Sequence, residues 1–435
     1  MRIGLMFSMN PMKKRRGAWS KYPAAFFLLF IVLQYPPYLF AETPQGNSCV
    51  ACHEDAWEEL RGSIHGQQGI SCHQCHGGDP TKSDKALAKA PGTGYVGIPD
   101  KKQIVQVCGQ CHADVEVMNF YGTRTDQLAR YKTSVHGKKL LLEGDQKVAA
   151  CSDCHGYHDV VRVTDPNSPV YPSNIPKTCN QCHGKKKLMD SYGLPSDIFD
   201  TYKSSVHGVA LLEKKDISVA QCASCHGGHG AVPPGVKAIG DTCGKCHINE
   251  KKYFLESPHA KLSEQGKFSE CISCHGNHGV HKPSPALYAE ACVKCHAEGS
   301  PEFKQGQTIA DAMQKAGTGL EEAEAIVKQA SVEGLFVEEE AASLEKAKTD
   351  VISMAPLQHT LSEKRILALH DQVASEVQAI KQNIQEKREN LKRRKLMLIP
   401  IWIFVFIMVL AFLAKYKELE RKKKDDDGHG RKPNN

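Results

Sequence analysis

Nine C-x-x-C-H motifs constrain this 435-residue chain more than any other feature. In each motif two cysteines lie three residues apart, and a histidine follows the second. Nine motifs use all eighteen cysteines of the chain, so no thiol remains for a disulfide, a zinc site or a nucleophile. The cysteines are Cys49 and Cys52, Cys72 and Cys75, Cys108 and Cys111, Cys151 and Cys154, Cys179 and Cys182, Cys222 and Cys225, Cys243 and Cys246, Cys271 and Cys274, and Cys292 and Cys295.

C-x-x-C-H is the attachment motif of c-type haem. Two thiols at this spacing can each add to one vinyl group of a porphyrin, and the next residue supplies the proximal iron ligand. We therefore expect nine covalently bound haem c groups. Their proximal ligands are His53, His76, His112, His155, His183, His226, His247, His275 and His296. The alternatives are zinc ribbons and a disulfide framework, and neither needs a histidine after every second cysteine.

The motifs belong to a repeated unit, and each repeat is one physical unit. Residues 179–229 (copy 3) repeat residues 108–158 (copy 2) without a gap. Each holds two motifs, a central histidine in S-x-H, and a last histidine in C-H-G-x-H. Residues 49–79 (copy 1) and 243–278 (copy 4) are shorter, because the first cysteine precedes the central histidine by 16 residues instead of 28. Cys292 begins a fifth copy that is not completed.

A low-spin, electron-carrying haem needs a second axial ligand, and a histidine there gives a low-potential iron with two imidazoles. Seven histidines outside the motifs recur at fixed places in the copies, and we expect them to be these distal ligands. They are His65, His136, His207 and His259 in S-x-H, and His158, His229 and His278 in C-H-G-x-H. An ordinary polar or turn histidine is the alternative at each position. In copy 1, Asp79 replaces the last histidine.

Two haems then still need a distal ligand, and His73, His281, His359 and His370 compete for them. The distal ligands of the haems at Cys72 and Cys292 are the least certain, so an iron without a distal ligand would be expected at one of these two haems. We favour His359, next to an expected helix start, as the ligand that completes the fifth copy at Cys292. The alternative for His370 is a place in a helix-packing seam.

Residues 1–41 have the layout of a secretory signal, with six basic residues, no acidic residue and an apolar run at 24–33. Cleavage after Ala41 and retention as an uncleaved anchor both stay open, and either would export the rest of the chain. Without this segment the chain has 50 basic and 49 acidic residues. Because each haem also adds two propionates, the net charge gives no argument for nucleic-acid binding.

Residues 297–395 contain no cysteine and are rich in Ala, Glu, Lys and Leu, which favours helix. We expect helices at about 303–330, 333–354 and 360–395, the last begun by a capping box of Thr360 and Glu363. An apolar stripe on the last helix would pack against another helix or form a homo-oligomer. The stripe contains Ile366, His370, Val373, Val377, Ile380, Ile384 and Leu391.

Residues 396–414 carry no charge, and a stretch of about 20 apolar residues spans a bilayer. A buried core helix is the alternative. Basic clusters flank the segment on both sides, so the excess of positive charge that marks cytoplasmic loops does not orient it. The haems decide the orientation, because they are attached outside the cytoplasmic membrane. Residues 415–435 would then be a charged cytoplasmic tail.

The chain resembles the membrane-anchored multihaem cytochromes c of the cytochrome c3-like superfamily. The resemblance rests on C-x-x-C-H-G-x-H at 151–158, 222–229 and 271–278, and on S-V-H-G at 134–137 and 205–208. It covers residues 49–296. It implies electron transport in anaerobic respiration, with a quinone-linked membrane subunit and periplasmic cytochromes as partners. The helical region is also similar to the C-terminal regions of multihaem nitrite reductases and hydroxylamine oxidoreductases.

We expect a mainly α and irregular fold in which the haems form the core of residues 42–300, because about 28 residues per haem are too few for a conventional core. A helical region (301–395) and a transmembrane helix (396–414) come after it. The expected function is electron carriage by a periplasmic haem domain anchored in the bacterial inner membrane, without enzymatic activity. The alternative is a reductase of nitrite, hydroxylamine or a sulfur oxyanion with one open haem. Every motif ends in histidine, and further histidines are nearly numerous enough to close every iron, which favours the carrier.

Overall fold

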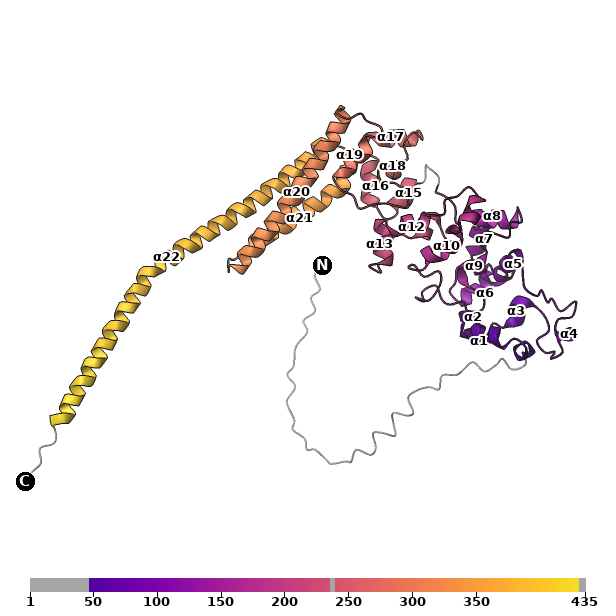
Figure 1. The fold of residues 1–435 in the computed structure, drawn as a ribbon, viewed down its shortest axis with the longest axis horizontal. Coiled ribbons are helices and arrows are strands. Elements are labelled where there is room, and N and C mark those ends of the chain that lie inside the picture. Colours follow the sequence, from indigo (N-terminus) through magenta and orange to yellow (C-terminus); the bar gives the residue numbers. More distant parts are fainter. Residues whose placement is uncertain (1–46, 235–238, 430–435) are drawn as a thin grey trace, which may run out of the picture. The chain divides into compact units, whose positions relative to one another are not determined.

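A computed structural model of the protein describes residues 47–234 and 239–429 (Figure 1). This part of the chain consists of helices and irregular segments and contains no β-strand. The mainly α and irregular fold expected from the sequence is therefore confirmed. The expected signal segment, residues 1–41, lies outside the described residues.

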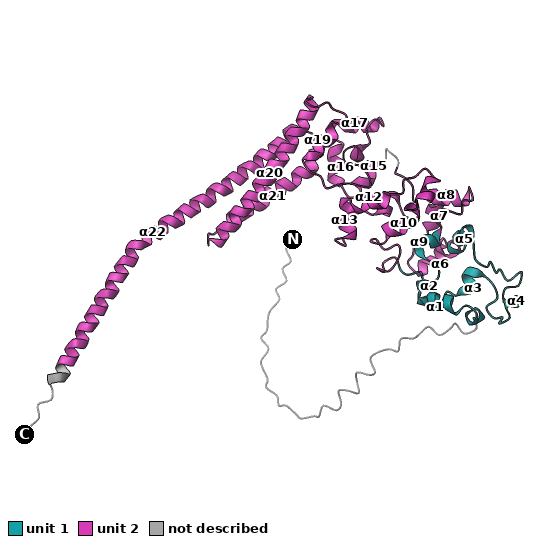
Figure 2. Cartoon of the chain, viewed as in Figure 1, with its two compact units in different colours: residues 1–108, 151–162 teal, residues 109–150, 163–435 magenta. Residues whose placement is uncertain are grey.

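Two compact units make up the chain (Figure 2). Unit 1 comprises Met1–Cys108 and Cys151–Arg162, and unit 2 comprises Gly109–Ala150 and Val163–Asn435. The helices that lie in unit 1 or begin there are short. They are η1 (Ser48–Ala51), α1 (Glu54–Gly62), α2 (Ile64–Gln67), α3 (Cys72–His76), α4 (Lys85–Ala88), α5 (Lys101–His112) and α9 (Cys151–His155).

The first part of unit 2 is also built from short helices. They are α6 (Val115–Phe120), α7 (Gln127–Thr133), α8 (Val135–Leu141), α10 (Ile175–His183), α11 (Lys186–Asp190), α12 (Ile198–Lys203), α13 (Val206–Leu212), α14 (Cys222–His226), α15 (Ile239–Gly244), α16 (Ile248–Phe254), α17 (Pro258–Glu264), α18 (Glu270–His275) and α19 (Ala286–Cys292). The extra residues of the long copies form α6 and α11, which explains why copies 2 and 3 are longer.

The C-x-x-C-H motif determines the length of several of these helices. In α3, α9 and α14 the helix is the motif itself, from its first cysteine to its histidine. A glycine follows the histidine and takes a positive φ, 82° at Gly227 and 71° at Gly276. A residue with a Cβ is strained in this conformation, so glycine ends the helix at the motif histidine.

Each central histidine is the second residue of a short helix that is preceded by a serine. In copy 3 the buried Ser205 caps α13, and its Oγ accepts a hydrogen bond from the amide of Gly208 at 3.0 Å. The hydroxyl of Tyr202 donates to the carbonyl of Ala220 at 2.9 Å, just before the second motif. Copy 2 has the same serine cap and the same tyrosine bond. The S-x-H-G pattern is thus a device that fixes the histidine.

Three long helices come last: α20 (Pro301–Val332), α21 (Glu338–Leu357) and α22 (Glu363–His429). They pack along one another as a bundle (Figure 1). The apolar stripe of α22 supplies much of the bundle core. The buried core residues are Ile309, Ala312, Ala316, Ala323, Val327, Ala330, Leu344, Met354, Ile366, Val373, Val377, Ile380 and Ile384. The stripe therefore packs within the chain.

A short 3₁₀ helix, η3 (Gln358–Thr360), joins α21 to α22. The expected capping box is wrong, because Thr360 belongs to η3 and Leu361 takes a left-handed conformation with φ of 52° before α22 begins at Glu363. The second helix was expected at about 333–354, whereas α21 begins at Glu338 and runs through Pro356 to Leu357.

Helix α22 continues beyond the bundle, so the two elements expected at 360–395 and 396–414 form one helix. It contains an apolar window long enough to cross a membrane, and none of that window is buried in the chain. Trp402, for example, is 69 % exposed. The predicted long apolar C-terminal helix is confirmed, and its exposure is compatible with a membrane anchor.

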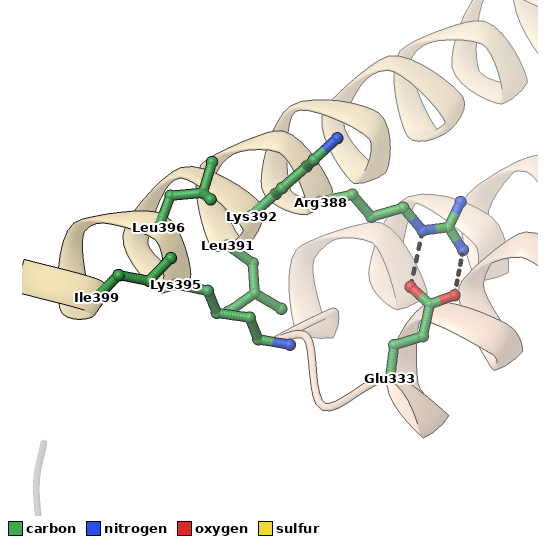
Figure 3. Close-up of a pocket in the computed structure, with 7 residues that line it drawn as sticks. All are labelled: Glu333, Arg388, Leu391, Lys392, Lys395, Leu396 and Ile399. Carbon is green, nitrogen blue, oxygen red and sulfur yellow. Dashed lines mark hydrogen bonds and ion pairs between the residues drawn. The ribbon is translucent and has the colours of Figure 1, made fainter. Parts of the chain in front are cut away.

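A shallow groove marks the place where α22 leaves the bundle (Figure 3). Arg388 donates from Nε and Nη2 to the carboxylate of Glu333 at 2.8 and 3.1 Å. The remaining lining residues are two lysines and three apolar residues: Leu391, Lys392, Lys395, Leu396 and Ile399. Basic side chains next to apolar ones are typical of a helix that enters a membrane interface.

Candidate haem-binding sites

The motif helices place their reactive groups on one face. Residues three and four apart are neighbours on a helix, so both thiols and the histidine of a motif face the same side. All eighteen cysteines are free. Among the described residues no group of three or more His, Cys, Asp or Glu side chains converges as a bare metal site would require. Two thiols and a histidine on one face suit a porphyrin, which supplies four iron ligands of its own and leaves two for the protein.

Six motif histidines face a second histidine ring at nearly one distance. The ring centroids are 5.9 to 6.3 Å apart. Two imidazoles bound to one metal through bonds of about 2.0 Å have centroids roughly 6 Å apart, so these pairs fit the axial ligands of a haem iron. The pairs are His76 with His158, His136 with His183, His207 with His247, His226 with His278, His259 with His296, and His275 with His359.

The pairs follow a rule that links neighbouring copies. The first motif histidine of a copy faces the central histidine of the preceding copy, as His247 faces His207. The second motif histidine faces the last histidine of the following copy, as His226 faces His278. Five of the six pairs obey the rule. The distal ligand of a haem would therefore come from a neighbouring copy, which sequence spacing could not tell.

A repeated backbone hydrogen bond explains this register. In copies 1, 2 and 3 the donor is the backbone amide of the residue that follows the serine of S-x-H. The acceptor is a backbone carbonyl of the next copy. It belongs to the second residue after the last histidine of that copy. The bonds are Ile64 to Val160 at 2.8 Å, Val135 to Ala231 at 3.1 Å, and Val206 to Val280 at 2.8 Å. The same clamp thus fixes the central histidines of copies 1, 2 and 3 relative to the next copy.

Several of the paired histidines are held through Nδ1. The Nδ1 atoms of His76, His226 and His359 lie 2.9, 3.2 and 3.0 Å from backbone carbonyl oxygens. His158 Nδ1 lies 3.4 Å from a carboxylate oxygen of Glu59. A proton on Nδ1 that is donated in this way leaves the lone pair of Nε2 for a metal, and such partners orient metal-binding histidines in general.

Burial favours the neutral, metal-binding form of many predicted axial ligands. Desolvation lowers the pKa of His112, His183, His207, His229, His259, His275 and His278. Only neutral imidazole has a lone pair to offer a metal, so this burial suits ligation.

The cysteines show which attachment sites are neighbours. The first cysteines of the two motifs of a copy hydrogen-bond to each other in copies 2, 3 and 4. This bond raises the pKa of the thiols of Cys108, Cys179 and Cys271 and lowers the pKa of their partners Cys151, Cys222 and Cys243.

Attachment sites of successive copies are also close. Burial and, next, Cys243 raise the pKa of the Cys225 thiol, and burial followed by Cys292 does the same for Cys274. The sites in unit 2 from Cys179 to Cys292 are therefore neighbours in chain order. In unit 1, burial and then Cys72 raise the pKa of Cys49.

The last copies correct one expectation. His359 was expected to face the motif at Cys292, but it faces His275 of the motif at Cys271, and His296 faces His259. The reason is the register between copies. The fifth copy has no last histidine to face His275, and η3 brings His359 there instead.

The other competing histidines do not face a motif histidine in the described structure. His73 lies 3.2 Å from the hydroxyl of Ser71, and His281 is exposed. The Nδ1 of His370 lies 2.9 Å from a carboxylate oxygen of Asp371, on the surface of α22. The side chain of His370 is 20 % exposed, and its nearest described polar partner is its neighbour on α22.

Sequence reasoning also missed a residue. The Nζ of Lys89 lies 3.5 Å from Nε2 of His53, the histidine of the first motif. Lys89 lies in the segment 79–102, which reads as an exposed loop rich in Lys, Pro and Gly. No repeat marks this lysine, because the other copies lack the segment.

The glycine of S-x-H-G provides a test of this architecture. A Cβ on Gly208 would collide with the carbonyl oxygen of Tyr202. We expect Gly208→Ala to destabilise the protein by about 3 kcal/mol and to displace His207 from His247, which should appear as high-spin haem in the electronic spectrum. Gly317→Ala is the control, because nothing lies within 4 Å of its added Cβ. Equal stability and equal spectra of the two variants would refute the role of this glycine.

Comparison with known proteins gives two matches. The sequence model of the family Cytochrome c3 matches residues 64–184, and that of the family Cytochrome c554 and c-prime matches residues 242–322. Neither a curated protein nor a solved structure matches the chain significantly. The two matched stretches include all six histidine pairs in part or in whole, and the second extends into α20.

Proposed function

Because the chain is a multihaem c-type cytochrome, we propose that it binds nine haem c groups and carries electrons. The carrier would link a quinone-linked partner in the membrane with periplasmic or outer-membrane acceptors. Each haem iron supplies a one-electron site, and the chain holds it through two thioethers and two axial side chains.

The observation that carries this proposal is that six motif histidines each face a second histidine ring at the distance expected for two axial ligands of one iron. An iron with two protein ligands has no position for a substrate, so paired imidazoles favour electron transfer over catalysis. The haems at Cys72 and Cys292 were the expected places for an open iron. The pairs of His76 with His158 and His296 with His259 support closed irons there too.

The order of the attachment sites supports the same function. Neighbouring thiols imply neighbouring porphyrins, and the thiols of unit 2 follow one another in chain order. A series of adjacent one-electron sites can pass electrons along its length. A single catalytic site would not need such a series.

The membrane location belongs to the same proposal. The exposed apolar part of α22 would anchor the chain in the bacterial inner membrane, with the haem domain in the periplasm and the tail from Lys415 in the cytoplasm. The segment 1–41 would serve export. The apolar stripe of α22 is already packed within the bundle, so a homo-oligomer would have to form through the membrane span or another surface.

The test uses the full-length protein in detergent. After reduction with dithionite and removal of the excess, a soluble monohaem cytochrome c should take up about one electron per haem. Nitrite, hydroxylamine and sulfite should not be turned over. Sustained turnover of any of them at about 1 s⁻¹ or faster would replace the carrier by the reductase.

A further inference from the structure

The first motif differs from the six paired motif sites described above in what its histidine faces. Nε2 of His53 lies 3.5 Å from Nζ of Lys89. Across the described part of the chain no histidine ring is recorded facing His53. Two donor nitrogens bound to one metal through bonds of about 2.0 Å are roughly 4 Å apart, so this amine and this imidazole are spaced like an axial pair.

The supply of histidines points to the same site. The seven recurrent histidines and His359 provide eight distal imidazoles for nine motifs. One haem therefore needs another kind of ligand. The rule between copies gives the first motif of a copy the central histidine of the preceding copy, and residues 1–48 contain no histidine.

The fold holds Lys89 at this place. Asp84 caps α4 by accepting hydrogen bonds from the amides of Ala86 and Leu87 at 2.9 and 3.0 Å. The amide of Asp79 donates to the carbonyl of Ala88 at 2.8 Å, which ties the end of α4 to the second motif of copy 1. Lys89 follows directly and is half-buried. The segment after Asp79 is therefore folded back and positioned.

The surroundings of the amine fit a ligand better than a surface charge. The Nζ lies 4.9 Å from the ring centroid of Tyr95, which covers one side of it. Lys89 takes part in none of the ion pairs between described residues, so none of these carboxylates competes for its amine.

We propose that Lys89 is the sixth ligand of the haem attached at Cys49 and Cys52, opposite His53. This inference rests on the proposed haem binding of the first motif. On ligation the ammonium loses one proton to solvent, and the lone pair of the neutral amine binds the iron without any change of its oxidation state.

The site would be the one axial position of the series that is easily exchanged. Four of the paired histidines, His76, His158, His226 and His359, have a partner at Nδ1 that would hold the ring beside the iron, whereas a lysine has one nitrogen on a flexible four-carbon stem. An added small ligand such as cyanide or imidazole should therefore enter at this haem before any other.

The experiment compares the full-length holoprotein with three variants by near-infrared magnetic circular dichroism and electron paramagnetic resonance. The oxidised protein should show one low-spin haem with the charge-transfer band of imidazole and amine ligands. Lys89→Ala and Lys89→Arg should each turn that haem high-spin, since arginine keeps the charge but does not ligate. Lys89→His should restore a low-spin haem with two imidazoles.

Lys85→Ala is the matched control, because Lys85 lies one helical turn earlier in α4 and is exposed. The haem content of each variant, measured as pyridine haemochrome, distinguishes two questions. One is whether the first motif binds haem, and the other is whether Lys89 ligates that haem. If the unchanged protein carries no haem at the first motif, the proposed haem binding of that motif is refuted. Full haem content with identical spectra for Lys89→Ala and the unchanged protein would overturn the role of Lys89 and leave the carrier function standing.

Discussion

Replacing His359 with alanine should turn one haem from low-spin to high-spin without loss of haem. The reason is that His359 faces His275 at 6.1 Å and is the only ring that the described structure places there. The loss of one imidazole leaves the iron with five ligands, so its potential should rise. Electron paramagnetic resonance of the oxidised protein would show the high-spin signal directly, at about one haem in nine.

The bundle positions His359 through contacts that the variant leaves in place. Tyr288 donates its hydroxyl proton to Oε1 of Gln358 at 2.8 Å, and Gln305 donates from Nε2 to the carbonyl of Leu361 at 2.6 Å. These bonds hold η3 from both sides. The effect of His359→Ala should therefore be confined to the iron, and the thermal unfolding of the bundle should change little.

His370→Ala is the control for this prediction. His370 lies in the same helical region, pairs with Asp371, and has a side chain that is 20 % exposed. Its replacement should leave every haem low-spin. To identify the affected haem, His359→Ala is combined with Cys271→Ala and Cys274→Ala. The high-spin signal should then vanish with the haem, and its persistence would place His359 at another site.

Removal of the attachment site at Cys243 and Cys246 should interrupt the series of haems within unit 2. The thiol of Cys243 lies between those of Cys225 and Cys271, and it touches the latter. The double variant Cys243→Ala and Cys246→Ala should contain eight haems. Its oxidation by a soluble acceptor should change from one fast phase to a fast and a much slower phase, as followed by stopped-flow absorbance.

Loss of the site at Cys292 and Cys295 is the matched control. It also removes one haem, but from the end of the series in unit 2, so the remaining sites stay contiguous. A single fast phase is expected. Two phases in both variants, or one phase in both, would mean that electrons do not follow the order of the attachment sites.

The sequence indicates candidate haem-binding residues because their chemistry is local. Two thiols and a histidine must be close in sequence to act on one porphyrin, so each C-x-x-C-H motif can be read without the fold. The repeats extended this reasoning to His136 and His207, which recur 71 residues apart. Composition predicted the three helices of the bundle, and the uncharged stretch 396–414 predicted the apolar end of α22.

The features that the sequence could not predict depend on contacts between distant segments. His359 faces His275 and not His296, because His296 already faces His259 of the preceding copy. Lys89 lies in a segment that has no counterpart in the other copies, and the sequence contains many lysines. The continuity of α22 through residue 396 likewise follows from helix packing and exposure, which composition alone does not determine.

The central claim is that every haem iron of this chain is closed by two protein ligands. Low-temperature electron paramagnetic resonance with magnetic circular dichroism on the oxidised, haem-replete protein tests it most directly. We predict nine low-spin haems, eight with two imidazoles and one with an imidazole and an amine. A reproducible high-spin haem in protein with full haem content would contradict this claim, because an open iron is what a reductase needs and a carrier does not.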